Sequence, residues 1–374
     1  MTVQIKEINT KRDLKKFIQF PQKLYRGNPY YVPALFFDDF NTLRWDKNPA
    51  FDHSEARYWL AYLNGEIVGR IAGILCHRHA EQWGQNYIRF GWIDFIDDFE
   101  VSKNLIQAVE QWAQDSGMTA VHGPLGFTDL DPEGMLVEGF NELGTLVTIY
   151  NYPYYVEHLE KLGYVKDIDW VEYEINVPSK PNEKIARAAN IVMKRNNLRL
   201  LDAKNKKELL KYAPDLFQLL CAEYQHLYGF VPLSEKQMDN YIDQYIGFVS
   251  PDFIPVVLDN NNQMIAFGIV IPSLSKALQK SKGRLIPFGF IHILKALKNN
   301  NRADLYLVAV KKEYQGKGVN AILINKMNEV FNKLGVQKVE SNPELETNLN
   351  VQGQWKFYET RQHKRRRCYI KHLK

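Results

Sequence analysis

The pattern of apolar and polar positions predicts short strands joined by tight turns, and one such unit occurs twice. Residues 58–63 and 67–75 are β-prone segments separated by Asn64–Gly65, the strongest short signal for a β-hairpin. Residues 253–258 and 264–271 repeat this arrangement in the second half of the chain. The recurrence indicates that the chain is built from two copies of one plan.

Amphipathic helices recur in the same way. Residues 105–124 match residues 323–342 at an offset of 218, and Gly117 stands opposite Gly335. In each copy an apolar stripe at helical spacing ends at the glycine and is followed by a short β-like segment. Strands that alternate with helices in this way predict an α/β fold with mixed central sheets flanked by helices.

The length of 374 residues suits two domains. We expect one domain at 1–180 and a second at 181–374, with a linker between Pro178 and Pro181. A bridging helix is predicted to follow at 183–196. Two tandem copies of one supersecondary unit account for the length of the chain.

A strand, a glycine-bearing loop and a helix follow one another in the second copy. Residues 305–310 are apolar, residues 315–320 read Gln-Gly-Lys-Gly-Val-Asn, and a helix then continues to Gly335. The first amides of a helix lack partners and the helix dipole favours negative charge there, so this junction can bind a phosphate. Lys317 adds a cation. The alternative is a plain connection in which the glycines only shape the turn.

The same residues resemble motif A of the GNAT-type N-acetyltransferases. Val310, Tyr314, Gln315 and Gly318 stand at the positions of the motif, whereas Asn320 replaces its last small residue. The resemblance extends over nearly the whole chain as a tandem GNAT protein, and it implies acetyl-CoA as the acyl donor, bound by the C-terminal copy. The cofactor-binding residues that it implies are Val308, Val310, Gln315, Gly316, Lys317, Gly318, Val319 and Asn320.

The corresponding position in the first copy is acidic. At the offset of 218, the loop residues fall opposite Asp97, Asp98 and Glu100. These carboxylates would repel a pyrophosphate, so we expect the first copy not to bind coenzyme A in the same manner. The first half is also acidic overall and the second half basic. Residues 1–180 carry 17 Lys/Arg and 26 Asp/Glu, whereas residues 181–374 carry 31 Lys/Arg and 17 Asp/Glu. A basic second half suits a polyphosphate ligand.

Family resemblance also implies how the acyl group moves. GNAT enzymes transfer it directly to an amine, and many use a tyrosine to protonate the departing thiolate. Tyr358 occupies such a place, on a predicted helical face with Val351 and Trp355. The alternative is a core tyrosine with a satisfied hydroxyl group.

A base that deprotonates the amine is harder to identify. Glu340 follows the motif at the end of the next predicted strand, and Asp304 and Tyr306 lie before or within the motif strand. Each could accept a proton directly or through water. The alternative interpretation is that these are solvated residues at a sheet edge.

We expect the amine acceptor between the two copies. Segment 123–141 is rich in glycine and carboxylates, and an acidic loop would suit a cationic amine; its carboxylates are Asp129, Asp131, Glu133 and Glu138. The insert 272–302 and the helix end 223–228 are further candidates for substrate contact. Segment 123–141 could equally be an ordinary polar loop.

A basic run precedes the last predicted strand. Residues 361–367 contain five Lys/Arg, which invites a nucleic-acid interpretation. A charged turn that leads into a terminal strand explains the run as well, and contact with the 3′-phosphate of the nucleotide is a third option. Because no RNA-binding signature accompanies the run, nucleic acid is not the expected partner.

Other features limit the class of protein. Three dispersed cysteines, Cys76, Cys221 and Cys368, argue against a disulfide framework. His77 and His79 stand alone, so we expect no metal. The N-terminal residues lack the apolar segment of a secretory signal, and no segment is long enough to span a membrane. The most hydrophobic segment, 284–297, is too short and contains a proline. We therefore expect a cytoplasmic protein without a membrane partner, as a monomer or homodimer.

The favoured function is transfer of an acetyl or other acyl group from acyl-CoA to the primary amine of a small molecule or peptide. A Fem-like transferase that draws on aminoacyl-tRNA is the first alternative, although such enzymes need no phosphate loop. A non-catalytic acyl-CoA-binding protein is the second, because no base is evident from the sequence.

Overall fold

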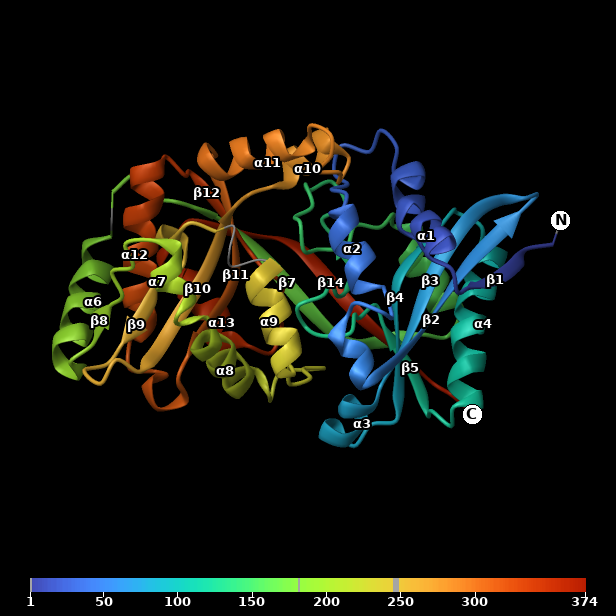
Figure 1. Ribbon diagram of the computed structural model, residues 1–374, viewed down its shortest axis with the longest axis horizontal. Coiled ribbons are helices and arrows are strands. Elements are labelled where there is room, and N and C mark those ends of the chain that lie inside the picture. Colours follow the sequence, from blue (N-terminus) through green and yellow to red (C-terminus); the bar gives the residue numbers. More distant parts are fainter. Residues whose placement is uncertain (1, 181, 245–248) are drawn as a thin grey trace.

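A single mixed sheet runs through the computed structural model, which describes residues 2–180, 182–244 and 249–374 (Figure 1). The strand order is β1 (Gln4–Ile8), β2 (Ser54–Leu63), β3 (Glu66–Cys76), β4 (Tyr87–Phe95), β5 (Ala120–Gly123), β14 (Thr360–His372), β7 (Val165–Asn176), β12 (Lys338–Ser341), β11 (Arg302–Val310), β10 (Met264–Pro272), β9 (Val256–Leu258) and β8 (Arg199–Leu200). Two short strands lie off this path, β6 (Met135–Glu138) beside β14 and β13 (Glu344–Leu345) beside β7. The predicted α/β class is confirmed.

Helices flank the sheet along its length. In Figure 1, α4 (Phe99–Asp115) lies at the right end, and α6 (Glu183–Asn196) and α12 (Val319–Leu334) lie together at the left end. The other helices are α1 (Lys11–Leu24), α2 (Phe36–Thr42), α3 (His77–Trp83), α5 (Tyr154–Lys161), α7 (Lys206–Leu210), α8 (Ala213–Tyr224), α9 (Glu235–Gln244), α10 (Ser275–Ser281), α11 (Gly289–Lys298) and α13 (Leu349–Gln352). Among the residues described, no helix is both long and apolar enough to cross a membrane.

The internal repeat is visible in the pairing of the strands. Hairpin β2–β3 corresponds to β9–β10, and each hairpin pairs antiparallel with the next strand, β4 or β11. The strand that follows is parallel in both copies, β5 against β4 and β12 against β11. A parallel pair needs a crossover, which α4 and α12 provide. Both crossover helices are followed by left-handed glycines, Gly117 and Gly335.

The two halves of the chain exchange their last strands. Strand β7 belongs to the first half in sequence but pairs with β12 of the second half, for example Asn176 with Lys338. Strand β14 ends the second half but pairs with β5 of the first, for example Tyr369 with Gly123. In Figure 1 the green β7 and the red β14 run side by side through the middle of the molecule. A domain boundary at residue 180 stays a prediction, and the sheet runs across it. Pro181 lies outside the described residues.

Two predicted elements differ from the structure near the C-terminus. The helix expected from Val351 is a short α13 followed by a 3-10 helix, Gly353–Phe357, so Tyr358 lies beyond the helical segment. The basic run 361–367 is not a turn, because all of it belongs to β14. Charged side chains occupy both faces of this strand, so the run lacks the apolar–polar alternation that usually identifies a strand.

Candidate active site

A cavity of about 820 Å³ lies where the two halves meet. Its walls come from β10, β11, α8 and the start of α12 in the second half. The first half contributes Asp129, Leu130, Asp131, Glu133, Leu146, Val147, Trp170, Ile175 and Val177. Most of the lining side chains are aliphatic or aromatic. This cavity is a space between the two copies in which the predicted acceptor site could lie.

Strand β11 separates from its parallel neighbour β12 at this cavity. Their pairing ends at Leu305 and Ser341. The register against β10 shifts at the next residue, so that Tyr306 forms a bulge. Beyond it the carbonyl oxygens accept side-chain hydrogen bonds, Val308 from the Tyr224 hydroxyl at 3.0 Å and Val310 from the Gln315 amide at 2.9 Å. Because the N–H and C=O groups of a strand residue point to the same edge, the N–H groups of Val308 and Val310 also face this opening.

Loop residues 315–320 form an open cradle of amides. Gly316 and Gly318 have φ angles of 70° and 82°, in the left-handed region that favours glycine. Their N–H groups, and those of Val319 and Asn320, have no hydrogen-bond acceptor within the part of the chain that the structure describes. The N-terminus of α12 adds the positive end of its dipole. The donor set fits an anion such as a pyrophosphate.

Side chains fix this loop in place. Gln315 donates a hydrogen bond to Glu223 at 2.7 Å, and the same carboxylate accepts one from the Lys312 amide at 2.8 Å. A Cβ atom on Gly318 would lie 3.1 Å from Val192 of α6, whereas one on Gly316 would meet nothing within 4 Å. Lys317 is exposed, lies over the ring of Tyr314, and does not line the cavity.

The corresponding junction in the first half is already capped. Asp98 is the N-cap residue of α4, and its carboxylate accepts a hydrogen bond from the Glu100 amide at 2.9 Å. Asp97 lies beside it, 3.3 Å from His158. A carboxylate of the chain itself thus occupies the place where α12 presents free amides. The predicted contrast between the two loops is present in their geometry.

Tyr358 lies in the wall of the cavity although the predicted helix is absent. Its N–H donates to the carbonyl oxygen of Trp355 at 2.9 Å, and its hydroxyl oxygen accepts a hydrogen bond from Asn328 at 2.7 Å. Burial raises the pKa of Tyr358, so the phenol stays protonated at neutral pH. Asn328 belongs to α12, so one helix both begins at the amide cradle and positions this hydroxyl group.

None of the three predicted bases is solvated at an edge, since Asp304 and Glu340 are buried and Tyr306 is half-buried. Asp304 and Glu340 face each other across β11 and β12, and neither lines the cavity. Glu340 forms an ion pair with Lys364. Burial, with Glu340 nearby, raises the pKa of Asp304. Tyr306 does line the cavity, and burial raises the pKa of its phenol well above the usual range, which is unfavourable for a base.

Glu344 is a carboxylate in the cavity wall that the sequence analysis did not select. One oxygen accepts a hydrogen bond from Trp355 Nε1 at 2.9 Å, and the other is buried without a partner among the described residues. Burial raises the pKa of Glu344 to about 7, which suits a proton acceptor near neutral pH. It lies only four positions after Glu340, so extending the predicted strand end past Pro343 would have included it.

Three of the four predicted acidic side chains face the same space. Asp129, Asp131 and Glu133 line the cavity, and burial raises their pKa values, that of Asp131 to about 6. Asp131 is held by hydrogen bonds from the Phe127 and Thr128 amides at 2.8 and 3.2 Å. Glu138 lies elsewhere and pairs with Arg365. The insert 272–302 contributes nothing to the lining, whereas Glu223, Tyr224 and residues 226–228 do.

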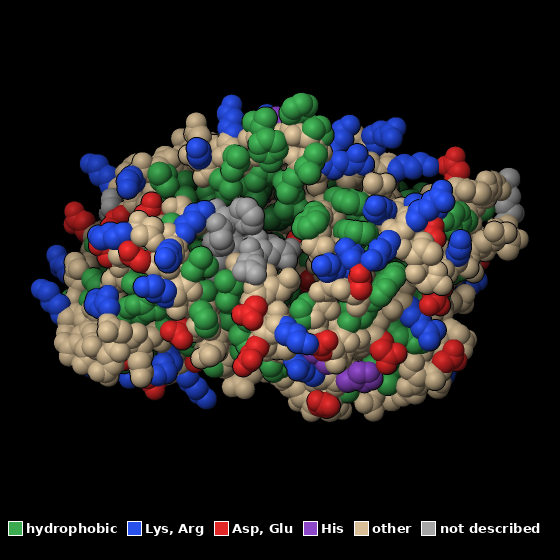
Figure 2. All heavy atoms as spheres, in the orientation of Figure 1, with side chains coloured by type: hydrophobic (Ala, Val, Ile, Leu, Met, Phe, Trp, Pro, Cys, Tyr) green, Lys and Arg blue, Asp and Glu red, His purple; other side chains and the backbone are tan. Residues whose placement is uncertain are grey.

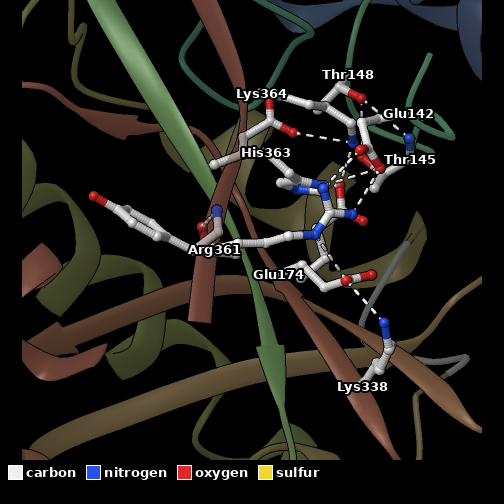
Figure 3. A network of polar contacts seen from close by, with 12 residues as sticks. Glu142, Thr145, Thr148, Glu174, Lys338, Arg361, His363 and Lys364 are labelled. Atoms are coloured by element: carbon white, nitrogen blue, oxygen red, sulfur yellow. Dashed lines mark hydrogen bonds and ion pairs between the residues drawn. The ribbon is translucent and has the colours of Figure 1, made fainter. Parts of the chain in front are cut away.

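The basic run is neutralised by carboxylates of the same sheet. Arg361 makes hydrogen bonds of 2.7 and 3.0 Å to Glu142 and one of 3.2 Å to Glu174, which also accepts from Lys338 at 2.9 Å (Figure 3). Further along the strand, Lys364 pairs with Glu340, Arg366 with Glu172 and Arg367 with Asp169. The run is therefore an internal ion-pair network, which leaves the nucleic-acid interpretation without its basis.

Two groups of side chains bring potential metal ligands close together among the described residues. Glu172, Glu340 and His363 form one, but Lys364 and Arg366 already pair with both of its carboxylates. His122, Asp167 and Cys368 form the other, and the Tyr228 hydroxyl makes hydrogen bonds to all three. The carboxylates of the first group and Asp167 of the second have protein partners, whereas both ring nitrogens of His363 and Nε2 of His122 are buried without a hydrogen bond among the described residues. The expectation of no metal stays a prediction.

Comparisons with known proteins agree with this geometry. The model of the acetyltransferase (GNAT) family matches residues 213–363. Protein YghO of Escherichia coli is 30% identical over 372 residues, which cover 97% of this chain and 94% of that one. Bacterial ceramide synthase of Caulobacter vibrioides is 25% identical over 361 residues, with 91% and 90% covered. A tandem GNAT protein from the clavulanic acid biosynthesis pathway superposes with a TM-score of 0.56 at 12% identity, over 99% and 98% of the chains. The chain belongs to the GNAT acyltransferase family and has the tandem GNAT fold.

Proposed function

We propose that this protein is an acyl-CoA-dependent N-acyltransferase whose acceptor is a primary amine on a long apolar chain. The observation that carries the proposal is that one cavity joins the amide cradle, Tyr358, Glu344 and the carboxyl groups of Asp129, Asp131 and Glu133 inside mainly apolar walls. The cradle and the splayed edge of β11 are the features that would bind acyl-CoA, because both present free backbone amides.

The residues of the cavity can perform direct transfer. After the bound acceptor has lost its ammonium proton to solvent, the neutral amine nitrogen attacks the thioester carbonyl, the carbon–sulfur bond breaks and an amide bond forms. Glu344, with a pKa of about 7, accepts the proton that the amine loses. Tyr358 remains protonated and gives its proton to the departing thiolate of coenzyme A. Asp131, with a pKa of about 6, supplies negative charge for a cationic acceptor while it binds, whereas burial keeps the Glu133 carboxyl group protonated by raising its pKa well above the usual value.

The proposed substrates have longer hydrocarbon chains than those of acetyl transfer to a small amine. A cavity of about 820 Å³ with mainly aliphatic and aromatic walls favours substrates with long hydrocarbon segments over an acetyl group and a small polar amine. The name of the Caulobacter relative points the same way, since a ceramide is an N-acylated long-chain amino alcohol. We therefore place a long-chain amino alcohol first among the acceptors, and a long-chain acyl-CoA first among the donors.

Free thiol release from acyl-CoA tests the proposal. Long-chain acyl-CoA and a long-chain amino alcohol should together release coenzyme A and yield an amide detectable by mass spectrometry, whereas short amines should react at least tenfold more slowly. Gly318→Glu should abolish binding of coenzyme A, because a carboxylate would enter the cradle. Gly163→Glu is the matched control, another left-handed glycine but one remote from the cavity.

Two outcomes would contradict the proposal. Equal binding of coenzyme A by wild type and Gly318→Glu would place the nucleotide elsewhere. Tight binding of acyl-CoA without turnover on any amine would instead indicate a non-catalytic acyl-CoA-binding protein. The basic run gives no support to an RNA partner, because its side chains are paired internally. Transfer from aminoacyl-tRNA, which rests on the net basic charge of the second half, stays the first alternative.

A further inference from the structure

The insert between β10 and β11 forms a separate ledge at the top of the molecule in Figure 1. Helix α10 holds it against the first half, because Gln279 donates hydrogen bonds to the carbonyl oxygens of Pro29 and Tyr31 at 2.8 and 2.9 Å. The loop after α10 is fixed as well, since the Phe36 amide donates to Gly283 at 2.9 Å. The ledge is thus tied to both halves of the chain.

The outer side of this ledge is apolar and open to solvent. Ile286 is 82% exposed and Phe288 is 69% exposed, and Phe290, Ile291 and Leu294 of α11 are exposed with them. Figure 2 shows hydrophobic side chains gathered at the top of the view, over the position of α11. The opposite side of the helix, with Ile293, Ala296 and Leu297, packs on the core. A helix apolar on both sides needs a second apolar environment beyond the protein.

The charged side chains of the insert itself all have one sign. Residues 260–303 contain neither aspartate nor glutamate. The six cations between β10 and β11, at residues 273–301, are all exposed, and none forms an ion pair within the described part of the chain; they are Lys276, Lys280, Lys282, Arg284, Lys295 and Lys298. Elsewhere carboxylates neutralise the basic residues closely, as in β14. Unpaired cations that border exposed aliphatic and aromatic side chains are complementary to an anionic lipid surface.

We propose that the α10–α11 ledge docks the protein peripherally on a bilayer that contains anionic lipids, with the side chains of α11 in the interfacial layer. A second copy of the chain is the less suitable occupant, because a two-fold interface would set the six cations against the same six. The expectation of no membrane partner came from the lack of a spanning segment, and an interfacial helix needs none. Docking is independent of the catalytic proposal, since no residue of 272–302 lines the cavity.

Sedimentation with lipid vesicles tests this inference. Wild-type protein should bind vesicles made of phosphatidylethanolamine and phosphatidylglycerol, and should bind phosphatidylcholine vesicles at least tenfold more weakly. Phe288→Glu with Ile291→Glu should lose binding. Lys280→Gln, Lys282→Gln and Arg284→Gln together should weaken it by about fivefold for each cation removed. High salt should weaken the binding of the wild type as well.

Matched controls carry the same changes on other exposed surfaces. Ile191→Glu on α6 alters an exposed isoleucine, and Lys6→Gln with Lys161→Gln alters exposed cations of the first half. Both should bind vesicles as the wild type does, and all variants should keep the wild-type thermal midpoint. Equal binding to anionic and neutral vesicles, or equal loss in controls and ledge variants, would overturn the inference. A wild-type dimer that Phe288→Glu dissociates, without vesicle binding, would do so too.

Discussion

At the scale of single residues, the hydroxyl group of Tyr358 can accept one hydrogen bond and donate another. Asn328 donates to its oxygen, which leaves the hydroxyl proton for a ligand. We expect Tyr358→Phe to lower kcat by on the order of 10²- to 10⁴-fold, because the thiolate would leave without its proton donor. Affinity for coenzyme A, measured by calorimetric titration, should stay within a factor of three.

Tyr173→Phe is the matched control for that change. Its hydroxyl also takes part in a hydrogen bond, to Gln352 at 3.2 Å, but Tyr173 does not line the cavity. Full activity in this control with loss in Tyr358→Phe would locate the effect in the cavity. Wild-type kcat in Tyr358→Phe would remove this tyrosine from the mechanism.

Glu344 should control the dependence of the rate on pH. Because its pKa is about 7 and a base must be unprotonated, kcat/KM should rise as pH increases through 7 and then level off. Glu344→Gln should lose this rise and be slower by on the order of 10²- to 10⁴-fold. Initial rates between pH 5.5 and about 9 measure it, and an unchanged rise in Glu344→Gln would assign the titration to another group.

The same carboxyl group should leave a mark on stability. Its pKa is raised from 4.5 to about 7 by folding, so the folded protein holds a proton that the unfolded chain has lost between those values. Stability contributed by this group is therefore lost as pH rises from 4.5 towards 7. Glu344→Gln should remove this decline, and its thermal midpoint should exceed that of the wild type above pH 7. Thermal midpoints that run parallel with pH would contradict this.

The site residues that act through their backbone amides could be predicted from the sequence. Gln315, Gly316, Gly318 and Asn320 were identified because a glycine loop between a strand and a helix is a local pattern. Glu344 was not, because its raised pKa results from burial among residues distant in sequence. Asn328 looked like an ordinary polar position on a helix until Tyr358 was placed against it.

At the scale of elements, α4 and α12 begin differently although they occupy equivalent places. Asp98 caps α4, whereas α12 begins at Gly318, which has no side chain. We expect Asp98→Ala to reduce the free energy of unfolding by about 1 kcal/mol, because an N-cap carboxylate is lost. Affinity for coenzyme A should not change. Urea denaturation and calorimetric titration measure the two quantities, and a changed affinity would mean that the first half takes part in nucleotide binding.

Most elements followed from local patterns. Hairpin β2–β3 and helix α6 were predicted because turn residues and helical spacing are read within a few positions. The neighbours of β7 and β14 could not be predicted, because any strand of suitable length can pair in either half of the sheet. Their exchange depends on ladders between residues far apart in the chain, such as Arg366 with Trp170.

At the scale of the whole molecule, a buried ion-pair network fastens the two halves. Glu172 of β7 is fully buried between Arg366 and Lys364 of β14, which hold the pKa of this carboxyl group below its usual value. Glu172→Ala should lower the free energy of unfolding by roughly 3–5 kcal/mol, because it leaves the buried Arg366 without a carboxylate partner, while Lys364 keeps only Glu340. Chemical denaturation measures it. Glu66→Ala, which breaks an exposed pair with Lys23, should leave the midpoint near that of the wild type.

The exchange of strands also determines when each half of the sheet can finish folding during synthesis. The sheet of the first half receives its neighbour for β5 only when residues 360–372 have been made. Until then this edge of β5 lacks its antiparallel partner, although residues 1–359 have already been made. Folding of the first half is thus held back by the last strand, and loss of a few C-terminal residues should damage the half of the molecule that is farther away in sequence.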